Sequence, residues 1–98
     1  MSGQERWNVR GRNIVGPQVR KMRMAQDWSQ RQLAIRLQLA GLDVSRSGVA
    51  KIESRLACVE DYELFYLAKV FGVGFASLFP KIDYQEPLNE TLETLTRK

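Results

Sequence analysis

The sequence contains no histidine, and Cys58 is its single cysteine. Zinc sites of the Cys/His kind and catalysis by a histidine base are therefore excluded. A single cysteine also rules out a disulfide within the chain, which favours a reducing compartment. We expect neither metal, cofactor nor enzyme activity, because no spacing brings two carboxylates together with a nucleophile and no glycine-rich phosphate loop follows a strand.

Long apolar runs are absent as well. No run approaches the ~18 to 20 residues that a membrane span needs, and the opening residues Met-Ser-Gly-Gln-Glu-Arg contain no apolar signal region. We therefore expect a cytoplasmic protein with no membrane partner. With 98 residues, 44% of them apolar, the chain is long enough for one compact domain with tails.

The charges are unevenly distributed along the chain. Residues 1–55 contain eleven Lys and Arg against four Asp and Glu, whereas residues 56–98 contain four against seven. A basic N-terminal half is typical of a protein that binds a polyanion such as nucleic acid. No basic segment has an apolar face broad enough to insert into a membrane surface, so nucleic acid is the favoured partner.

Apolar spacing predicts an all-α fold of five helices within residues 14–80. Proline at the start of a helix loses no hydrogen bond, so Gly16-Pro17 is expected to open the first helix, which ends near Gln26. Ser29 and Gln32 form a capping box that starts the second helix, and Gly41 ends it. The inward faces of these two helices comprise Val19 and Met22, then Leu33, Ala34 and Leu37.

The segment 45–54 is predicted to be a short helix with two different faces. Ser45 is its N-cap, and Val49 and Ile52 point inward. The outward face carries cationic, hydroxyl and methyl groups that suit base edges and phosphates: Arg46, Ser47, Ala50 and Lys51. Leu42 and Val44 in the preceding turn are expected to fill the gap between this helix and the one before it, so the pair is a helix-turn-helix candidate.

Glu53 is an acidic residue in an otherwise basic helix, next to the inward-facing Ile52. A partly buried carboxylate needs a cationic partner, because leaving it unpaired costs several kcal/mol. We expect Arg23 of the first helix to be that partner. A bidentate pair of this kind would fix the angle between the first and third helices.

The fourth helix is predicted to begin at Glu60-Asp61 and to end at Gly72. Its apolar residues leave only a narrow polar face, which predicts a central core helix: Tyr62, Leu64, Phe65, Leu67, Ala68 and Phe71. A short last helix follows, with Val73, Phe75, Leu78 and Phe79 as its apolar residues and Pro80 as its end.

Two flanking segments show weaker patterns. Residues 1–13 have no helical period and are expected to form a flexible basic arm. Its Arg6, Arg10 and Arg12 either reach phosphates or the minor groove of DNA, or belong to a basic tail with no defined contact. Residues 81–98 carry one leucine stripe, Leu88, Leu92 and Leu95. An isolated helix of that length is marginal, so the stripe either docks on the body, pairs in a dimer or frays.

The ordered set of these residues resembles the Cro/phage-repressor-type helix-turn-helix family, which has a lambda-repressor-like domain, over residues 14–79. The resemblance rests on Trp28-Ser29-Gln30, Leu33-Ala34, Val44-Ser45-Arg46-Ser47, Val49, Ile52-Glu53, Leu67-Ala68, Phe71-Gly72-Val73 and Leu78-Phe79. It implies a compact five-helix domain, often dimeric, that binds double-stranded DNA and regulates transcription. It also implies that Gln30 contacts a phosphate, that the exposed residues of the third helix read bases, and that Arg23 pairs with Glu53.

The chain departs from the family pattern at several positions. About five residues more than usual separate Ser29 from Glu53, with the surplus at residues 38–43. Arg55 occupies the place of a usual glycine and gains a phosphate-binding role, beside Arg31 and Ser54. Gly48 weakens the third helix by about 1 kcal/mol relative to alanine, so it is either a spacer for close approach to DNA or a tolerated defect.

Two functions are consistent with these patterns. The first is a sequence-specific transcriptional regulator, acting as a repressor and as a homodimer, that inserts the helix Ser45 to Ser54 into the major groove of DNA. The second is a protein-interaction module of helix-turn-helix shape, such as an antitoxin or a coactivator. The acidic C-terminal half with its leucine stripe favours the second.

Overall fold

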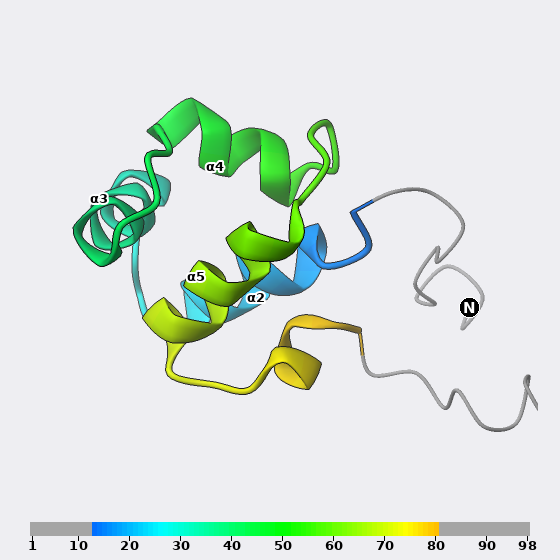
Figure 1. Ribbon diagram of the computed structural model, residues 1–98. Helices are drawn as coiled ribbons and strands as arrows, with labels where there is room; N and C mark the ends of the chain where they lie inside the picture. The colour runs from blue at the N-terminus through cyan, green and yellow to red at the C-terminus, as the bar shows by residue number, and fades with distance from the viewer. Residues whose placement is uncertain (1–12, 81–98) are drawn as a thin grey trace, which may run out of the picture.

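A computed structural model describes residues 13–80 of the protein, and in this part of the chain all regular structure is helical. The elements are α2 (Gly16–Ala25), α3 (Gln30–Ala40), α4 (Arg46–Glu53), α5 (Asp61–Phe71) and the 3-10 helix η1 (Phe75–Leu78). Figure 1 shows α4 above α2 and α5, with α3 seen nearly end-on at one side. The all-α prediction is confirmed, but the expected fifth helix is a single 3-10 turn within residues 13–80 rather than an α-helix.

Helix α3 begins as its sequence predicts. The Ser29 hydroxyl accepts a hydrogen bond from the backbone N–H of Gln32 at 3.0 Å, and the Gln32 side chain accepts one from the backbone N–H of Ser29 at 2.7 Å. This reciprocal capping box satisfies two backbone donors that the helix itself cannot pair. The helix ends at Gly41, whose φ of +121° lies in the region that favours glycine.

The surplus residues lengthen α3 and the turn that follows it. Helix α3 continues to Ala40, so residues 38–40 are helical, and residues 41–45 form the connection to α4. Leu42 is buried in the core, and Val44 packs against it. The Gln38 side chain donates to the backbone carbonyl of Val44 at 2.6 Å. The turn is therefore held by a buried leucine and a hydrogen bond to the end of α3.

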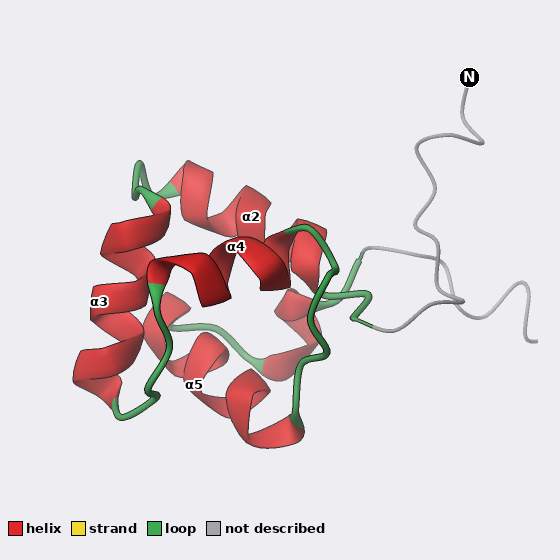
Figure 2. Cartoon of the chain, turned by 90° about the horizontal axis from the view of Figure 1, so that it is seen from above, coloured by secondary structure: helices red, strands yellow, loops and turns green. Residues whose placement is uncertain are grey.

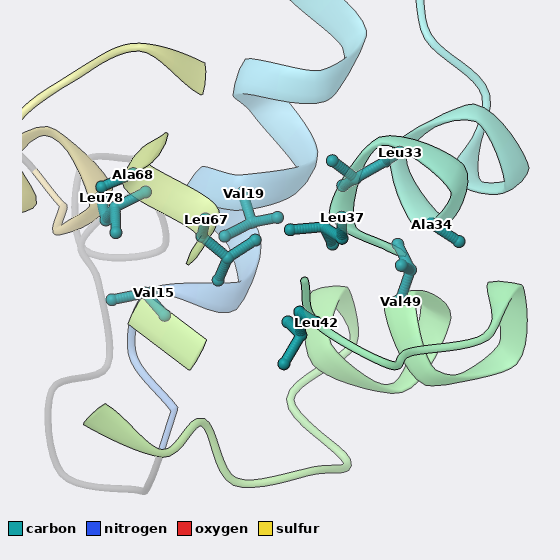
Figure 3. Close-up of a cluster of buried hydrophobic side chains, with 10 residues drawn as sticks. All are labelled: Val15, Val19, Leu33, Ala34, Leu37, Leu42, Val49, Leu67, Ala68 and Leu78. Carbon is teal, nitrogen blue, oxygen red and sulfur yellow. The ribbon is translucent and has the colours of Figure 1, made fainter. Parts of the chain in front are cut away.

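The core lies where the helices meet. Val19, Leu33, Leu37 and Val49 are fully buried, as the predicted inward faces require. Figure 3 shows the whole cluster, which comprises Val15, Val19, Leu33, Ala34, Leu37, Leu42, Val49, Leu67, Ala68 and Leu78. The cluster contains residues from all five elements. The buried face of α4 is therefore covered by several other elements together, and this packing attaches α4 to the rest of the domain.

Helix α5 is less buried than predicted. Its ends agree with the prediction, since Glu60 and Glu63 form a capping box and Gly72 adopts a left-handed conformation. Leu67 and Ala68 are buried, but Tyr62 is 56% exposed and Phe65 is 50% exposed. The prediction of a core helix with only a narrow polar face is therefore wrong. A helix buries only one face here, and these two aromatic residues lie on the other.

Candidate nucleic-acid interface

The outward face of α4 is the candidate interface. Seen from above, α4 crosses in front of the other helices, and both views leave its outer side uncovered by any other helix of residues 13–80 (Figures 1 and 2). Val49 and Ile52 turn inward, with exposed fractions of 0% and 4%. The side chains predicted to read bases lie on the other side: Arg46, Ser47 and Lys51 are exposed, and Ala50 is half-buried. The helical period thus separates an anchoring face from a polar face.

The N-terminus of α4 is fixed by Ser45. Its hydroxyl accepts a hydrogen bond from the backbone N–H of Gly48 at 3.1 Å, as expected of an N-cap. Gly48 has a further role that the sequence did not reveal. A Cβ at this position would lie 2.8 Å from Cγ2 of Val44, closer than real Cβ contacts come. Glycine therefore leaves room for Val44 in the turn, in addition to thinning the polar face of α4.

The Arg23–Glu53 pair expected from the sequence is present. The Arg23 Nε lies 2.6 Å from Oε2 of Glu53, and Nη2 lies 3.1 Å from Oε1. A third donor, Nη1, bonds the backbone carbonyl of Trp28 at 2.6 Å. The two side chains are only 11% and 2% exposed. This bidentate, buried geometry fixes α4 relative to α2 and to the residues that open α3.

Gln30 joins the same network. Its side-chain amide donates to Oε1 of Glu53 at 3.1 Å, so the first residue of α3 lies beside the last residue of α4. The start of α3 and the end of α4 are therefore in contact, although α3 is longer than in the family pattern. Arg31, the next residue of α3, is exposed. One N–H of the Gln30 amide is used by Glu53, which leaves the rest of that amide for an external group.

Two more predicted phosphate ligands follow α4 directly. Ser54 is exposed, and its hydroxyl donates to the Lys51 carbonyl at 3.3 Å. Arg55 is half-buried and has a φ of +66°, in the left-handed region. This conformation explains why a glycine suits the position. Gln30, Ser54 and Arg55 thus lie at the C-terminal end of α4, and Arg31 is the residue that follows Gln30 in α3.

Asn13 and Gly16 both contact the C-terminal end of α4, and the sequence predicted neither contact. The Asn13 amide donates to the carbonyls of Ile52 at 2.7 Å and Ala57 at 2.9 Å. A Cβ on Gly16 would overlap the Ile52 carbonyl oxygen. No local pattern predicts contacts between residues 39 and 44 positions apart. The sequence therefore carries no signal for these contacts, which form only when α2 and α4 pack together.

The other basic side chains of the described residues are distributed over several elements. Arg20 and Lys21 of α2 are exposed. The guanidinium of Arg36 lies 4.2 Å from the centre of the Trp28 ring, and Trp28 stacks on Phe71 with centroids 5.7 Å apart. Arg36 therefore makes a cation–π contact that helps to pack α3 against α5. Arg6, Arg10, Arg12 and the leucine stripe lie outside the described residues.

Other site types were sought in residues 13–80. In that span no group of three or more His, Cys, Asp or Glu side chains is placed to hold a metal ion. Nor does any helix there have the length and apolar character required to cross a bilayer.

Comparisons with known proteins give one match. A family model described as helix-turn-helix matches residues 19–78, more than half of the chain. No curated protein and no solved structure matches. The matched range contains the Arg23–Glu53 network, α3, the turn and α4, so it includes the parts that present the polar face.

Proposed function

Because the chain belongs to the Cro/C1-type helix-turn-helix family of lambda-repressor-like DNA-binding domains, we propose that it is a sequence-specific transcriptional repressor that inserts α4 into the major groove. The observation that carries this proposal is the exposed polar face of α4, held outward by its buried Val49, Ile52 and Glu53. We further propose that it acts in the cytoplasm, on double-stranded DNA.

The side chains of α4 suit base edges in distinct ways. Arg46 stands at the N-terminal end of the helix, where recognition helices contact bases, and a guanidinium can bond O6 and N7 of guanine together. The Ser47 hydroxyl and the Lys51 ammonium donate to groove acceptors, and the Ala50 methyl suits the methyl group of thymine. A good bidentate pair contributes about 1 to 3 kcal/mol of discrimination between bases.

The C-terminal end of α4 suits the DNA backbone. Gln30, Ser54 and Arg55 lie there, and Arg31 follows Gln30 in α3. Together these residues offer amide, guanidinium and hydroxyl donors to phosphate oxygens. Such contacts set the register of α4 in the groove and carry no sequence information themselves. In this proposal the N-terminal arm adds further phosphate contacts through Arg6, Arg10 and Arg12.

We also propose that the protein binds DNA as a homodimer. Two copies related by a two-fold axis would place two α4 helices in successive major grooves, about 34 to 36 Å apart. The operator would then be an approximate palindrome with half-sites one helical turn apart. The leucine stripe of Leu88, Leu92 and Leu95 offers one apolar surface for pairing.

Selection of DNA fragments from a genomic library, at two salt concentrations, tests the proposal. We expect one enriched sequence, which Arg46→Ala binds with relaxed preference at one base position. Arg31→Ala should weaken binding equally for all sequences and reduce the salt slope by about 0.9. Lys21→Ala, at an exposed position of α2, is the matched control and should change neither. The absence of an enriched sequence, or an unchanged preference of Arg46→Ala, would refute the base-reading role.

One observation favours the second candidate, a protein-interaction module. Tyr62 and Phe65 of α5 and Phe75 of η1 are each at least half exposed. Beside them lies an open apolar hollow, lined by Phe65, Ala68, Lys69, Val73, Gly74 and Phe75. Co-expression with proteins encoded by neighbouring genes discriminates the two functions. A stable complex that Phe65→Ser disrupts, together with no selected DNA, would favour an antitoxin or coactivator.

A further inference from the structure

The outer side of α5 and η1 carries aromatic residues that the described part of the domain does not cover. Tyr62 and Phe65 of α5 and Phe75 of η1 are each at least half exposed. The apolar hollow beside them is lined by residues of both elements and of the turn that joins them, and Lys69 is one of these residues. On a soluble domain, a contiguous apolar patch of this kind marks a contact with another molecule.

Two charges of opposite sign flank Phe65 in α5. Asp61 precedes it by four residues and Lys69 follows it by four, so the three side chains lie on one stripe of the helix. Asp61 and Lys69 are exposed, and among residues 13–80 neither forms an ion pair. Glu63, the other acid of the first turn, already accepts a hydrogen bond from the backbone N–H of Glu60 at 2.7 Å. The stripe therefore presents an acid, an aromatic ring and a base at equal spacing.

This order of charges is complementary to itself. When a second copy of α5 runs antiparallel, with a two-fold axis beside Phe65, the two Phe65 rings meet at the axis. A residue four positions away lies about 6 Å along the helix, so Asp61 of each copy lies opposite Lys69 of the other. A parallel arrangement would instead place like charges opposite each other. The stripe therefore favours one occupant, a second copy of the chain, in one orientation.

The position of α5 in the domain is compatible with DNA binding by both copies. In Figure 2, which looks down on α4, α5 lies at the lower edge of the domain. A two-fold axis beyond that edge, along the viewing direction, places the second copy beside the first and leaves the α4 helices of both copies facing the viewer. The two polar faces then point to the same side, as binding to one DNA duplex requires.

We propose that two copies of the chain pair through this surface with their α5 helices antiparallel, an inference that rests on the proposed homodimer and names its interface. The surface comprises Asp61, Tyr62, Phe65, Lys69 and Phe75. A half-exposed aromatic side chain contributes about 100 Å², so the three of both copies contribute roughly 600 Å². Stable interfaces bury about 1,200 to 2,000 Å² in total. We therefore expect a weak, reversible dimer in the absence of DNA.

Reversal of the two charges, one at a time and together, tests this pairing by sedimentation equilibrium on the full chain without DNA. Asp61→Lys and Lys69→Asp each place like charges opposite one another twice per dimer, so each should weaken homodimerisation at least about tenfold. The double variant restores opposite charges and should return to within about threefold of the parent. An equimolar mixture of the two single variants should form a heterodimer, because one chain is then positive at both positions and the other negative.

Lys21→Asp is the matched control, because it makes the same change in net charge as Lys69→Asp at an exposed position of α2. Its dimer should have the affinity of the parent. Both reversals in α5 oppose the helix dipole, since they place a cation in the first turn or an anion in the last. Circular dichroism therefore selects conditions under which every variant is helical. The neutral Asp61→Asn and Lys69→Gln replace any variant that unfolds, and each should weaken the dimer about threefold.

The outcomes are distinguishable. Pairing in the mixture of the two single variants, which neither shows by itself, supports the assignment. Unchanged dimer affinity in every charge variant would overturn this interface and leave the homodimer to another surface. A parent that stays monomeric up to roughly 1 mM would overturn the interface and the proposed homodimer together, whereas DNA selection by α4 is measured separately. A co-expressed protein that displaces the second copy, and that Phe65→Ser releases, would also overturn the assignment.

Discussion

Removal of the Arg23 guanidinium is the perturbation that most directly tests how α4 is held. Arg23→Met keeps an unbranched apolar side chain in place of the arginine stem but deletes the three donors that bond Glu53 and the Trp28 carbonyl. Glu53, whose side chain is 2% exposed, then retains a single donor from Gln30. The variant therefore leaves a buried carboxylate almost unpaired.

The expected loss of stability follows from this burial. Breaking a buried ion pair by removing one partner costs about 3 to 5 kcal/mol, whereas an exposed pair contributes about 0 to 1 kcal/mol. The Arg23–Glu53 pair is a buried pair, because neither side chain is more than 11% exposed. For a domain with a total stability of about 5 to 15 kcal/mol, the expected loss is a large fraction. Arg23→Met/Glu53→Met should recover much of it, since no unpaired charge remains buried.

Urea denaturation followed by far-ultraviolet circular dichroism measures these differences. Arg20→Met, an exposed position in the same helix, is the control and should change the free energy of unfolding by less than about 0.5 kcal/mol. A loss below about 1 kcal/mol for Arg23→Met would refute the reasoning, because the pair would then behave as an exposed one. A double variant less stable than Arg23→Met would refute the argument from the unpaired carboxylate.

Three further outcomes can be measured by the same denaturation assay and by DNA binding. Gly16→Ala should destabilise the domain by about 1 to 3 kcal/mol, because its Cβ would overlap the Ile52 carbonyl; a stabilised variant would show that α2 can shift. Arg55→Gly should relieve about 1 kcal/mol of left-handed strain while lowering the salt slope of DNA binding by about 0.9; an unchanged slope would remove Arg55 from the phosphate ligands. Gly48→Ala should change stability by less than about 1 kcal/mol, because higher helix propensity is offset by crowding of Val44; a gain above that value would show that Val44 moves freely.

The elements with local signals could be predicted from the sequence. The capping box of Ser29 and Gln32 and the cap at Ser45 involve residues three positions apart, so the pattern itself contains both partners. The Arg23–Glu53 pair spans 30 residues, yet it was predictable. A partly buried carboxylate requires a cationic partner, and Arg23 of the first helix was expected to be that partner. The need to pair a buried carboxylate therefore identified the partner of Glu53, although the two residues lie far apart in the sequence.

The remaining features depend on tertiary contacts that leave little trace in the sequence. The fifth element is a 3-10 turn of four residues, and a composition of apolar residues before a proline does not distinguish that from a short α-helix. Tyr62 and Phe65 look like core residues by type, but their burial depends on which face of α5 meets the body. Asn13 carries no signal for its contact with Ile52, because that contact exists only once α2 and α4 have packed.

The longer connection between Ser29 and Glu53 changes the outline of the motif without separating its ends. The added residues extend α3 away from Gln30, and Leu39 near its far end is 83% exposed. The chain then reverses at Gly41 and returns to the core at Leu42, whose burial fixes the start of the turn. The Gln30–Glu53 contact forms at the opposite end of α3, which the extension does not reach. The position of α4 relative to the start of α3 is therefore determined by its buried face and by the Glu53 network, and the length of the connection has little influence on it.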